Sequence, residues 1–360
     1  MAVLLYPLAG LPKNAYLGTM AAPILTLTPE GLYCPAGRFH VDPMRPVPRA
    51  LITHGHADHA RAGHGAVMAT AETLAIMALR YGADFTRAQQ IASLGETIQV
   101  GGVSVSFHPA GHVLGSAQIA VTQGAEKIVV SGDYKRASDP TCLPFEPVAC
   151  DIFITEATFG LPIFHHPDAA TEVAKLLESV AMFPERTHLV GAYSLGKAQR
   201  LAALIRQAGW DRPLYIHGAM DRLMDFYAAR GVVLGEMIRV ADTGRAKLPG
   251  EIVLCPPSSV GDAWSRRFAD PVACFASGWM RTRARARQRG VELPLIVSDH
   301  ADWAELTATI RETGCREVWV THGEADALVH WAGTRGIRAM PLHMLGYGDE
   351  DEAADPVATA

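Results

Sequence analysis

Short apolar runs that end in Gly, Asp or His recur along the first part of this chain, and they constrain its fold more than any other feature. Their β-branched residues and alternating polarity are typical of strands. Between two of these runs, TAETLAIMALRYG (70–82) has helical spacing, with Thr70 as the N-cap and Gly82 as the stop. The first 158 residues therefore predict a β-rich layered structure with few helices. The strand-like runs are RFHVDP (38–43), RALITHGH (49–56), VSVSFHPAGH (103–112), SAQIAVTQ (116–123), KIVVSGD (127–133) and DIFITEATFG (151–160).

After residue 160, segments with helical spacing alternate with strand-like segments, which predicts a parallel α/β unit. Strands that end in acids and histidines then return at LPLIVSDHAD (293–302) and EVWVTHGEAD (317–326). We therefore expect a first domain that is interrupted by an inserted domain and completed near the C-terminus. The expected parts are a flexible extension at 1–22, a first domain at 23–160 and 296–346, an inserted domain at 161–295, and an acidic disordered tail at 347–360.

Composition and charge fit an ordinary globular enzyme and set few limits on its partners. The 360 residues are 49% hydrophobic and 19% charged, and the formal charge of -5 neither requires nor excludes a polyanionic partner. The six cysteines form no CxxC pair, which favours buried thiols in a reducing cytoplasm over disulfides. Pro7, Pro12 and Lys13 interrupt the apolar N-terminal stretch, so we expect neither a signal peptide nor a transmembrane helix.

The heptapeptide THGHADH (53–59) concentrates three histidines and one aspartate at the end of a strand-like run. Alternate residues of an extended segment share a face, so His54 and His56 project together, while Asp58 and His59 follow in the turn. A two-metal centre needs more donors than these, because each ion takes about four to six. A single histidine at another strand end is more often a core or loop residue, but three further candidates follow apolar runs in this chain. They are His112, Asp133 and His322.

These residues resemble a known family. The series Asp42, HGHADH, His112 and Asp133 resembles the four metal motifs of the metallo-β-lactamase-fold hydrolases. Glu156 in TEATFG, His300 in SDHAD and His322 in THGE are similar to the three further motifs of the β-CASP nucleases, the nucleic-acid-processing branch of that fold. The resemblance covers about residues 24 to 345. The strings GLYCPAG, GAYSLGKAQ, CPPSS, ASGWM and SDHADW narrow it to the bacterial DNA ligase-associated exonucleases.

The resemblance implies an α/β fold, an αββα metallo-β-lactamase sandwich with an inserted α/β β-CASP cap domain. It also implies two divalent ions per chain, Zn²⁺ or Mn²⁺, since imidazole and carboxylate ligands suit both. Asp42 would orient the HxHxDH turn by accepting hydrogen bonds, although its spacing also fits a turn aspartate before Pro43. In the implied centre, His54, His56 and His112 bind one ion, Asp58, His59 and His322 bind the other, and Asp133 bridges them.

The same resemblance implies roles in phosphodiester hydrolysis. Asp58 would hold or accept the proton of the attacking water, and His300 would act as the general acid. Glu156 would keep the imidazole of His300 protonated and oriented. Asp299 stands where an SAHAD-like string is commoner in other β-CASP nucleases. It would either increase the proton affinity of His300 or cap the helix that follows, and we favour the cap.

Two segments offer groups that fit a nucleic-acid substrate. RTRARARQR (281–289) has five arginines at every second position, which line one face of an extended strand but are dispersed as solvated charge in a helix. GAYSLGKAQR (191–200) forms a glycine-containing turn that opens a helix, where free N–H groups attract phosphate, although simple helix entry is the alternative. The substrate-binding candidates from these segments are Ser194, Lys197, Arg281, Arg283 and Arg285.

These features predict a cytoplasmic, metal-dependent phosphodiesterase, a DNA exonuclease of DNA repair that acts on single-stranded or end-containing DNA. A DNA ligase and a helicase are its implied partners, and no membrane is involved. An RNA-processing exo- or endoribonuclease of the same fold stays open, because nothing in the sequence visibly reads a 2′-hydroxyl. A small-ester or thioester metallohydrolase fits less well, since a small substrate needs neither the long insert nor the arginine run. A non-catalytic nucleic-acid-binding module fits poorly, because every expected ligand is present.

Overall fold

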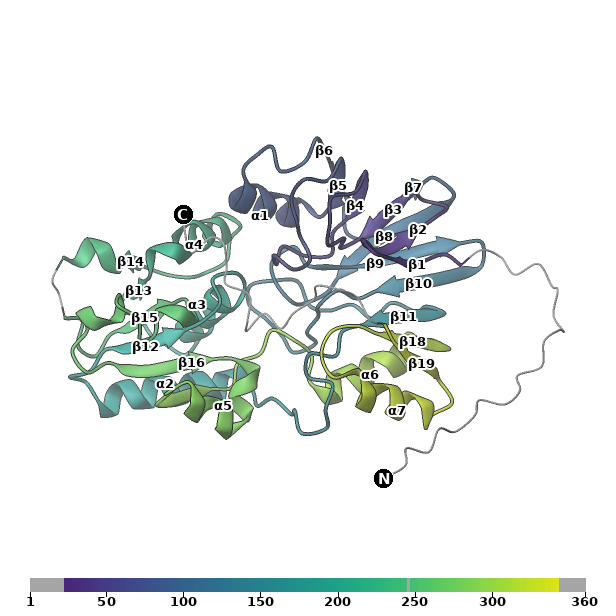
Figure 1. Ribbon diagram of the computed structural model, residues 1–360. Helices are drawn as coiled ribbons and strands as arrows, with labels where there is room; N and C mark the ends of the chain where they lie inside the picture. Colours follow the sequence, from purple (N-terminus) through teal and green to yellow (C-terminus); the bar gives the residue numbers. More distant parts are fainter. Residues whose placement is uncertain (1–22, 245–246, 343–360) are drawn as a thin grey trace, which may run out of the picture.

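The computed structural model describes residues 23–244 and 247–342, and their strands form three sheets (Figure 1). The predicted extension at 1–22 and tail at 347–360 lie outside the described residues. The first sheet has the strand order β1-β2-β3-β4-β5-β6. Its strands are β1 (Thr26–Thr28), β2 (Gly31–Cys34), β3 (Phe39–Val41), β4 (Arg49–Leu51), β5 (Ala66–Ala69) and β6 (Ala88–Ile91).

The second sheet joins strands from two distant parts of the chain. Its order is β19-β18-β11-β10-β9-β8-β7, in which β11 pairs in parallel with β18, so that Ile152 lies opposite Glu317. The sheet that begins before residue 160 is thus completed by strands near the C-terminus. The strands are β7 (Thr97–Val100), β8 (Val103–Pro109), β9 (Ala117–Gln123), β10 (Glu126–Val130), β11 (Ile152–Thr155), β18 (Glu317–Val320) and β19 (Arg338–Pro341).

The first two sheets pack face to face and carry helices on their outer faces, which gives four layers. Helix α1 (Ala71–Tyr81) covers the first sheet, and α6 (Trp303–Thr313) and α7 (Ala325–Gly333) cover the second (Figure 1). The predicted caps of α1 are confirmed, since the Thr70 side chain accepts the Thr73 N–H at 3.3 Å and the helix ends at Gly82. Successive residues at the end of β4 face different layers: Leu51 packs between the sheets, whereas Ile52, directly after the strand, packs under α1.

The third sheet is entirely parallel, with the order β14-β13-β15-β12-β16-β17. Val190 packs against helices α2, α3 and α4 on one face, and its neighbour Leu189 belongs to a separate cluster. We call residues 169–295 the parallel-sheet lobe. Its strands are β12 (His188–Gly191), β13 (Leu214–Ile216), β14 (Met237–Arg239), β15 (Ile252–Cys255), β16 (Val272–Ala276) and β17 (Leu293–Leu295), and its helices are α2 (Ala169–Met182), α3 (Lys197–Gln207), α4 (Asp221–Ala229) and α5 (Arg283–Gln288).

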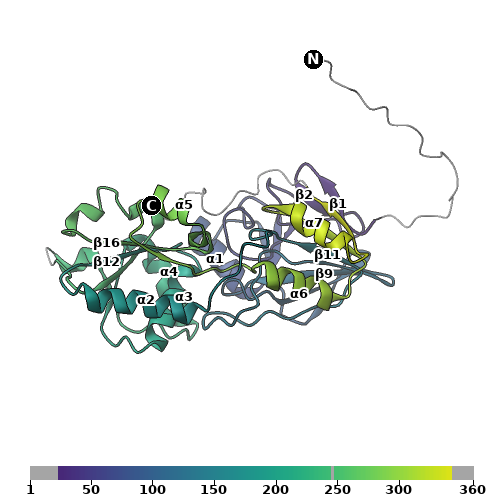
Figure 2. The same cartoon turned by 90° about the horizontal axis from the view of Figure 1, so that it is seen from below.

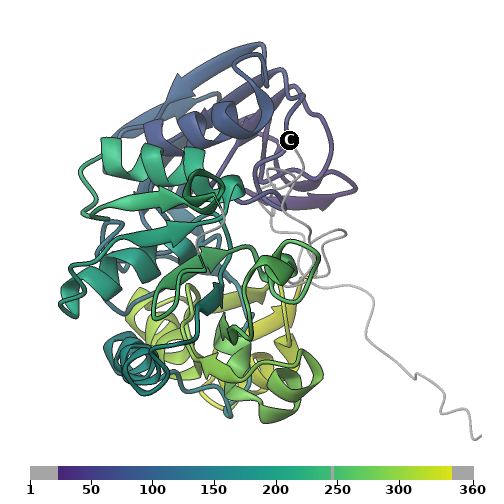
Figure 3. The same cartoon turned by 90° about the vertical axis from the view of Figure 1, so that its left-hand side faces the viewer.

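The parallel-sheet lobe lies beside the four layers and contacts them near the start of α3. Figures 2 and 3 show the lobe from two further sides, with α1 next to it. Ile76 of α1 belongs to the hydrophobic core of the lobe. The hydroxyl of Tyr227 in α4 accepts the Leu114 N–H at 3.1 Å. Gly196 lies so close to the loop after β8 that a Cβ atom there would be 2.4 Å from Val113 Cγ1.

The arginine run does not form the extended strand in which it would line one face. Residues Gly278–Arg281 form the 3-10 helix η5, and Arg283–Gln288 form α5. Alanine, arginine and glutamine favour helices, and Ala286 is buried in a cluster with Phe275 and Met280. Of the two alternatives, the run therefore forms the helical one, and most of its arginine side chains are exposed.

Candidate metal centre

The predicted ligands lie in turns that follow strands, and the fold brings them together. His54, His56, Asp58 and His59 follow β4. His112 follows β8, Asp133 follows β10, and His322 follows β18. Three groups of side chains have ligand atoms within 4.8 Å of one another. These are His54, His56, His112 and Asp133; Asp58, His59 and His322; and Asp133, Glu156 and His300.

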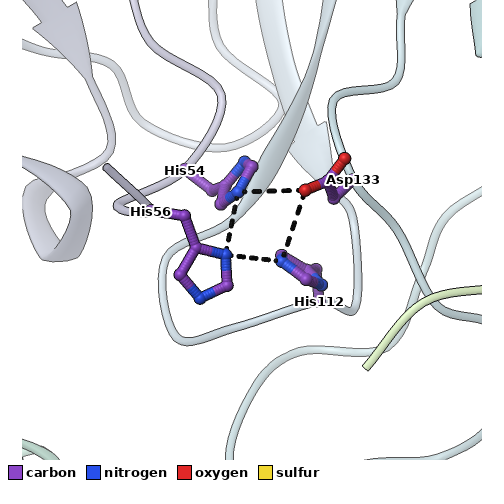
Figure 4. A group of neighbouring side chains, drawn as sticks. All are labelled: His54, His56, His112 and Asp133. Carbon is purple, nitrogen blue, oxygen red and sulfur yellow. Dashed lines mark hydrogen bonds and ion pairs between the residues drawn. The ribbon is translucent and has the colours of Figure 1, made fainter. Parts of the chain in front are cut away.

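In the first group, three imidazole nitrogens face one another and a carboxylate (Figure 4). His56 Nδ1 lies 3.1 Å from His54 Nε2 and 2.9 Å from His112 Nε2. Asp133 Oδ2 lies 3.4 Å from His54 Nε2 and 3.8 Å from His112 Nε2. Neutral imidazoles have little reason to direct ring nitrogens at one another unless a cation lies between them, so this arrangement fits a metal ion.

The second group lies next to the first, and Asp133 of the first group contacts it through His59. His59 Nε2 is 3.4 Å from Asp133 Oδ2 and 3.7 Å from Asp58 Oδ2. The ring of His322 stacks on that of His59, with 5.0 Å between the ring centroids and an angle of 25°. One oxygen of Asp133 thus lies at equal distances from His54 and His59, which is the placement that a bridging ligand needs.

The outer nitrogen of each first-group histidine is engaged by a partner that fixes the ring. The carbonyl of Asp299 accepts from His112 Nδ1 at 2.9 Å, and the carbonyl of Leu195 accepts from His56 Nε2 at 3.3 Å. The Thr53 hydroxyl donates its proton to Asp42 Oδ2 at 2.6 Å, so it accepts from His54 Nδ1 at 3.0 Å. The inner nitrogen of each neutral ring therefore presents a lone pair to the cluster, as metal binding requires.

The second group has equivalent outer partners. Asp42 Oδ2 accepts from His59 Nδ1 at 2.8 Å, and Asp42 Oδ1 accepts the Thr53 N–H at 2.8 Å. His322 Nδ1 lies 2.9 Å from the Thr321 hydroxyl, which donates to the Thr155 carbonyl at 3.3 Å. The structure thus brings Asp42 into contact with the HxHxDH turn through several hydrogen bonds.

Neighbouring charges shift the pKa values of the buried groups in this cluster in opposite directions. Burial and repulsion by His59 keep the pKa of His54 well below 6.5, which favours the neutral ring. Burial opposes charge on His59 too, but Asp133 and Asp58 raise the pKa of His59 well above 6.5. Burial also opposes ionisation of Asp133, but His59 and His54 hold its pKa well below 3.8. A divalent cation would supply positive charge in place of the proton on His59.

Glu156 and His300 form a buried pair beside the first group. Glu156 Oε2 accepts from His300 Nδ1 at 3.0 Å, and Glu156 Oε1 accepts the Tyr134 N–H at 2.8 Å. Burial raises the pKa of Glu156, and the neighbouring His300 opposes that shift. The ring of His300 lies 4.8 Å from that of His112, measured between centroids. The pair therefore has the geometry of an oriented imidazole at the edge of the metal cluster.

Asp299 lies in a buried ionic network and does not cap a helix, so the favoured prediction for this residue is wrong. Asp299 Oδ2 is 3.4 Å from Lys197 Nζ, and Asp299 Oδ1 is 3.6 Å from Arg200 Nη1. The cap of α6 is Asp302, whose side chain accepts the Glu305 N–H at 3.0 Å. An N-cap must directly precede the first helical residue, and Asp299 comes too early for that.

The five substrate-binding candidates have different surroundings. Ser194 and Lys197 are buried, and the Lys197 ammonium also lies 4.9 Å from the Tyr193 ring centroid. Arg281 and Arg283 are exposed, whereas Arg285 is half-buried over the ring of Trp279. Their roles in substrate binding stay predictions.

Comparison with known proteins identifies relatives but no matching family model. A protein of Opitutus terrae named a probable DNA ligase is 28% identical over 325 residues, covering 87% of this chain and 30% of that protein. Cleavage and polyadenylation specificity factor subunit 3-I of Arabidopsis thaliana is 23% identical over 363 residues, covering 78% of this chain and 52% of the relative. An RNase J-like protein of Methanocaldococcus jannaschii is 28% identical over 127 residues, covering 33% of this chain and 30% of the relative. The chain thus spans about half or less of each relative's length.

Among its relatives are nucleases of the β-CASP branch of the metallo-β-lactamase fold, and this similarity supports that family for the chain. A solved structure supports the fold alone: a protein of unknown function from Enterococcus faecalis V583 matches with a TM-score of 0.52 at 15% identity. That match covers 76% of this chain and 74% of the other. All six cysteines are free thiols, as predicted. Within residues 23–244 and 247–342, no helix combines the length and apolar character needed to cross a bilayer.

Sequence reasoning missed two threonines of this candidate site. Thr53 and Thr321 each precede a predicted ligand, and each hydroxyl contacts Nδ1 of that histidine, at 3.0 and 2.9 Å. A signal was present, because the tripeptide Thr-His-Gly occurs at both positions, each time after an apolar run. A repeated residue before a ligand indicates a repeated supporting contact, here the one that fixes the imidazole tautomer.

Proposed function

We propose that this protein is a nuclease that uses two divalent cations to hydrolyse DNA phosphodiester bonds, acting from a DNA end. The observation that carries the proposal is that Asp133 Oδ2 lies between two neighbouring donor groups, 3.4 Å from His54 of one and 3.4 Å from His59 of the other, with the Glu156–His300 pair beside them. His54, His56 and His112 would hold one cation and Asp58, His59 and His322 the other. The parallel-sheet lobe is the proposed cap over this centre.

Each residue beside the centre has a proposed task in hydrolysis. The two cations, Zn²⁺ or Mn²⁺, would lower the pKa of a water and neutralise charge on the phosphoryl oxygens. Asp58, whose carboxylate is 13% exposed, accepts a proton from the attacking water. Glu156 orients His300 through Nδ1, so that the other ring nitrogen donates a proton to the leaving oxygen.

DNA is the proposed substrate because the relative named a probable DNA ligase matches 87% of this chain. We therefore also propose a place beside a DNA ligase in repair. The helicase partner and the cytoplasmic location stay predictions. RNA is the competing substrate, because other relatives are named endoribonucleases, among them Endoribonuclease ysh1 of Aspergillus fumigatus, 32% identical over 136 residues.

The test compares matched single-stranded DNA and RNA oligonucleotides, labelled at one end or the other, with Mn²⁺ and Zn²⁺ supplied separately. We expect DNA to be shortened from one end, and Asp58→Ala and His59→Ala to abolish cleavage while circular dichroism shows an intact fold. His330→Ala is the matched control, because it removes an exposed imidazole outside the cluster. Full activity in Asp58→Ala would reject the metal-centre assignment. Faster cleavage of RNA would reject the DNA substrate, and internal cuts would reject the exonuclease mode.

A further inference from the structure

Two hydrogen bonds fix the backbone of Trp279 at the carboxyl end of β16. It lies in η5, directly after the strand, where the Ser277 hydroxyl accepts the Trp279 N–H at 3.2 Å and the Thr282 N–H donates to the Trp279 carbonyl at 3.0 Å. In open parallel sheets, ligands bind outside the carboxyl ends of the strands. Trp279 therefore occupies an edge of the parallel-sheet lobe where a ligand is expected.

An aromatic contact links Trp279 to the proposed general acid. The Phe159 ring lies 4.8 Å from the Trp279 ring and 6.1 Å from the His300 ring, measured between centroids. The packing is tight, because a Cβ atom at Gly278 would lie 2.4 Å from Phe159 Cζ. One phenylalanine ring thus lies between Trp279 and His300 and contacts the backbone of Gly278 closely.

Arg285 covers one face of Trp279. Its Cζ lies 3.8 Å from the indole centroid, the shortest of the Arg–aromatic distances found among the described residues, and both side chains are half-buried. Such a stack is not by itself a binding site, because Arg212 lies over Trp210 at 4.0 Å in the same lobe. That second stack precedes β13, so it lies at the amino ends of the parallel strands, whereas Trp279 lies at their carboxyl ends. What distinguishes Trp279 is its contact with Phe159, whose ring lies 6.1 Å from that of His300.

The surroundings of the Trp279–Arg285 stack are strongly cationic. Residues 281–289 carry five arginines and no acidic residue. Arg281, Arg283, Arg287 and Arg289 are exposed. A flat aromatic and guanidinium platform with arginines around it fits one ligand class well, an unpaired nucleobase whose neighbouring phosphates contact the arginines.

We infer that Trp279 and Arg285 form a stacking subsite for an unpaired nucleobase of single-stranded DNA next to the scissile phosphate. The base lies on the outer plane of the Arg285 guanidinium, whose inner plane rests on the indole. Stacking tolerates every base, so the subsite selects an unpaired base and does not select sequence. The inference rests on the proposed nuclease function, and it adds a substrate contact that the metal centre does not provide.

The experiment uses the full chain and single-stranded DNA oligonucleotides in which one abasic nucleotide is moved step by step away from the attacked end. We expect the wild-type protein to lose about 5- to 150-fold in kcat/KM at one abasic position, the range that the stacking of one base supplies. Trp279→Ala and Arg285→Ala should lose a similar factor in kcat/KM on intact DNA. They should cleave DNA that is abasic at that position as fast as they cleave intact DNA. Arg285→Lys keeps the charge but not the plane, and should behave like Arg285→Ala.

Trp210→Ala is the matched control, because it removes the equivalent stack at the amino ends of the strands, and it should keep the wild-type abasic profile. Fluorescence anisotropy of the same labelled oligonucleotides measures binding separately from cleavage. An unchanged abasic profile in Trp279→Ala, in cleavage and in binding, overturns the subsite and leaves the nuclease proposal intact. A wild-type protein that neither binds nor cleaves single-stranded DNA rejects the subsite, and the RNA oligonucleotides then decide whether nuclease function also fails.

Discussion

Replacing Thr53 by valine tests whether the residues around the metal ligands fix their tautomers. Valine keeps the branched shape of threonine, which matters because Thr53 packs tightly against the turn before Asp133. A Cβ atom at Gly132 would lie 2.7 Å from Thr53 Cβ. What valine removes is the hydroxyl, which donates to Asp42 at 2.6 Å and accepts from His54 at 3.0 Å.

The size of the effect follows from what each partner retains. Asp42 keeps its hydrogen bonds from the Thr53 N–H and from His59, both at 2.8 Å. His54 loses the Thr53 hydroxyl, which is the acceptor for its outer nitrogen. A buried polar group without a partner costs about 1–3 kcal/mol, so the metal-free variant should lose about that much free energy of unfolding. Losing a group that orients a ligand typically weakens metal affinity by about 10- to 100-fold, and we expect that loss here.

Competition with a chromophoric chelator measures the metal affinity, and urea unfolding of the metal-free protein measures stability. Thr53→Ser keeps the hydroxyl and should bind the cation nearly as tightly as the wild-type protein. Thr321→Val makes the same change beside His322, and it should weaken the other cation of the pair. If Thr53→Val binds both cations with wild-type affinity, Thr53 does not set the His54 tautomer and the geometric account of the first group fails.

Three further predictions concern acid stability, packing and metal removal. Burial lowers the pKa of His64 to about 4, so the unfolded chain takes up a proton there as the pH falls below about 6.5. Between pH 7 and pH 5, His64→Asn should therefore lose less free energy of unfolding than the wild-type protein, by on the order of 1–2 kcal/mol. Urea unfolding of metal-free protein measures the difference. Gly196→Ala should lower metal affinity and stability, because its Cβ would meet Val113 beside His112, whereas Gly209→Ala brings only backbone strain and should leave metal affinity unchanged. Chelation should lower the Tm and added Mn²⁺ or Zn²⁺ should restore it, so an unchanged Tm would show that the centre binds neither ion in the folded state.

Patterns within single segments predicted most of the fold. The strand runs before residue 160 and the α1 caps follow from local alternation and capping, and the structure confirms them. Short strands were missed, such as β6, whose residues are all exposed, and β16, whose apolar run lacks alternation. The arginine run shows the limit of periodicity, because the same alternation fits a strand or a short helix, and the burial of Ala286 decides between them.

The sequence predicted the histidines and aspartates of the site, because they follow apolar strand runs. It did not predict the contacts that backbone carbonyls and the parallel-sheet lobe make with those histidines. No sequence pattern reveals that the carbonyls of Leu195 and Asp299 hold His56 and His112. Those contacts join residues far apart in the chain, so they depend on how the lobe packs. The same holds for Asp299, whose partner Lys197 lies on α3.

The interrupted topology ties the metal centre to the proposed acid. The chain passes from the parallel-sheet lobe back to the second sheet between β17 and β18. His300 follows β17 and His322 follows β18, so this one stretch carries both the proposed acid and a proposed metal ligand. Asp299 lies within that stretch: its carbonyl fixes His112, while its carboxylate holds Lys197 at the start of α3. A shift of α3 would thus move His300 and disturb the His112 tautomer together. Variants at this contact should therefore change metal affinity and turnover in parallel, whereas variants of the Trp279–Arg285 stack should change the use of substrate and leave metal affinity unchanged.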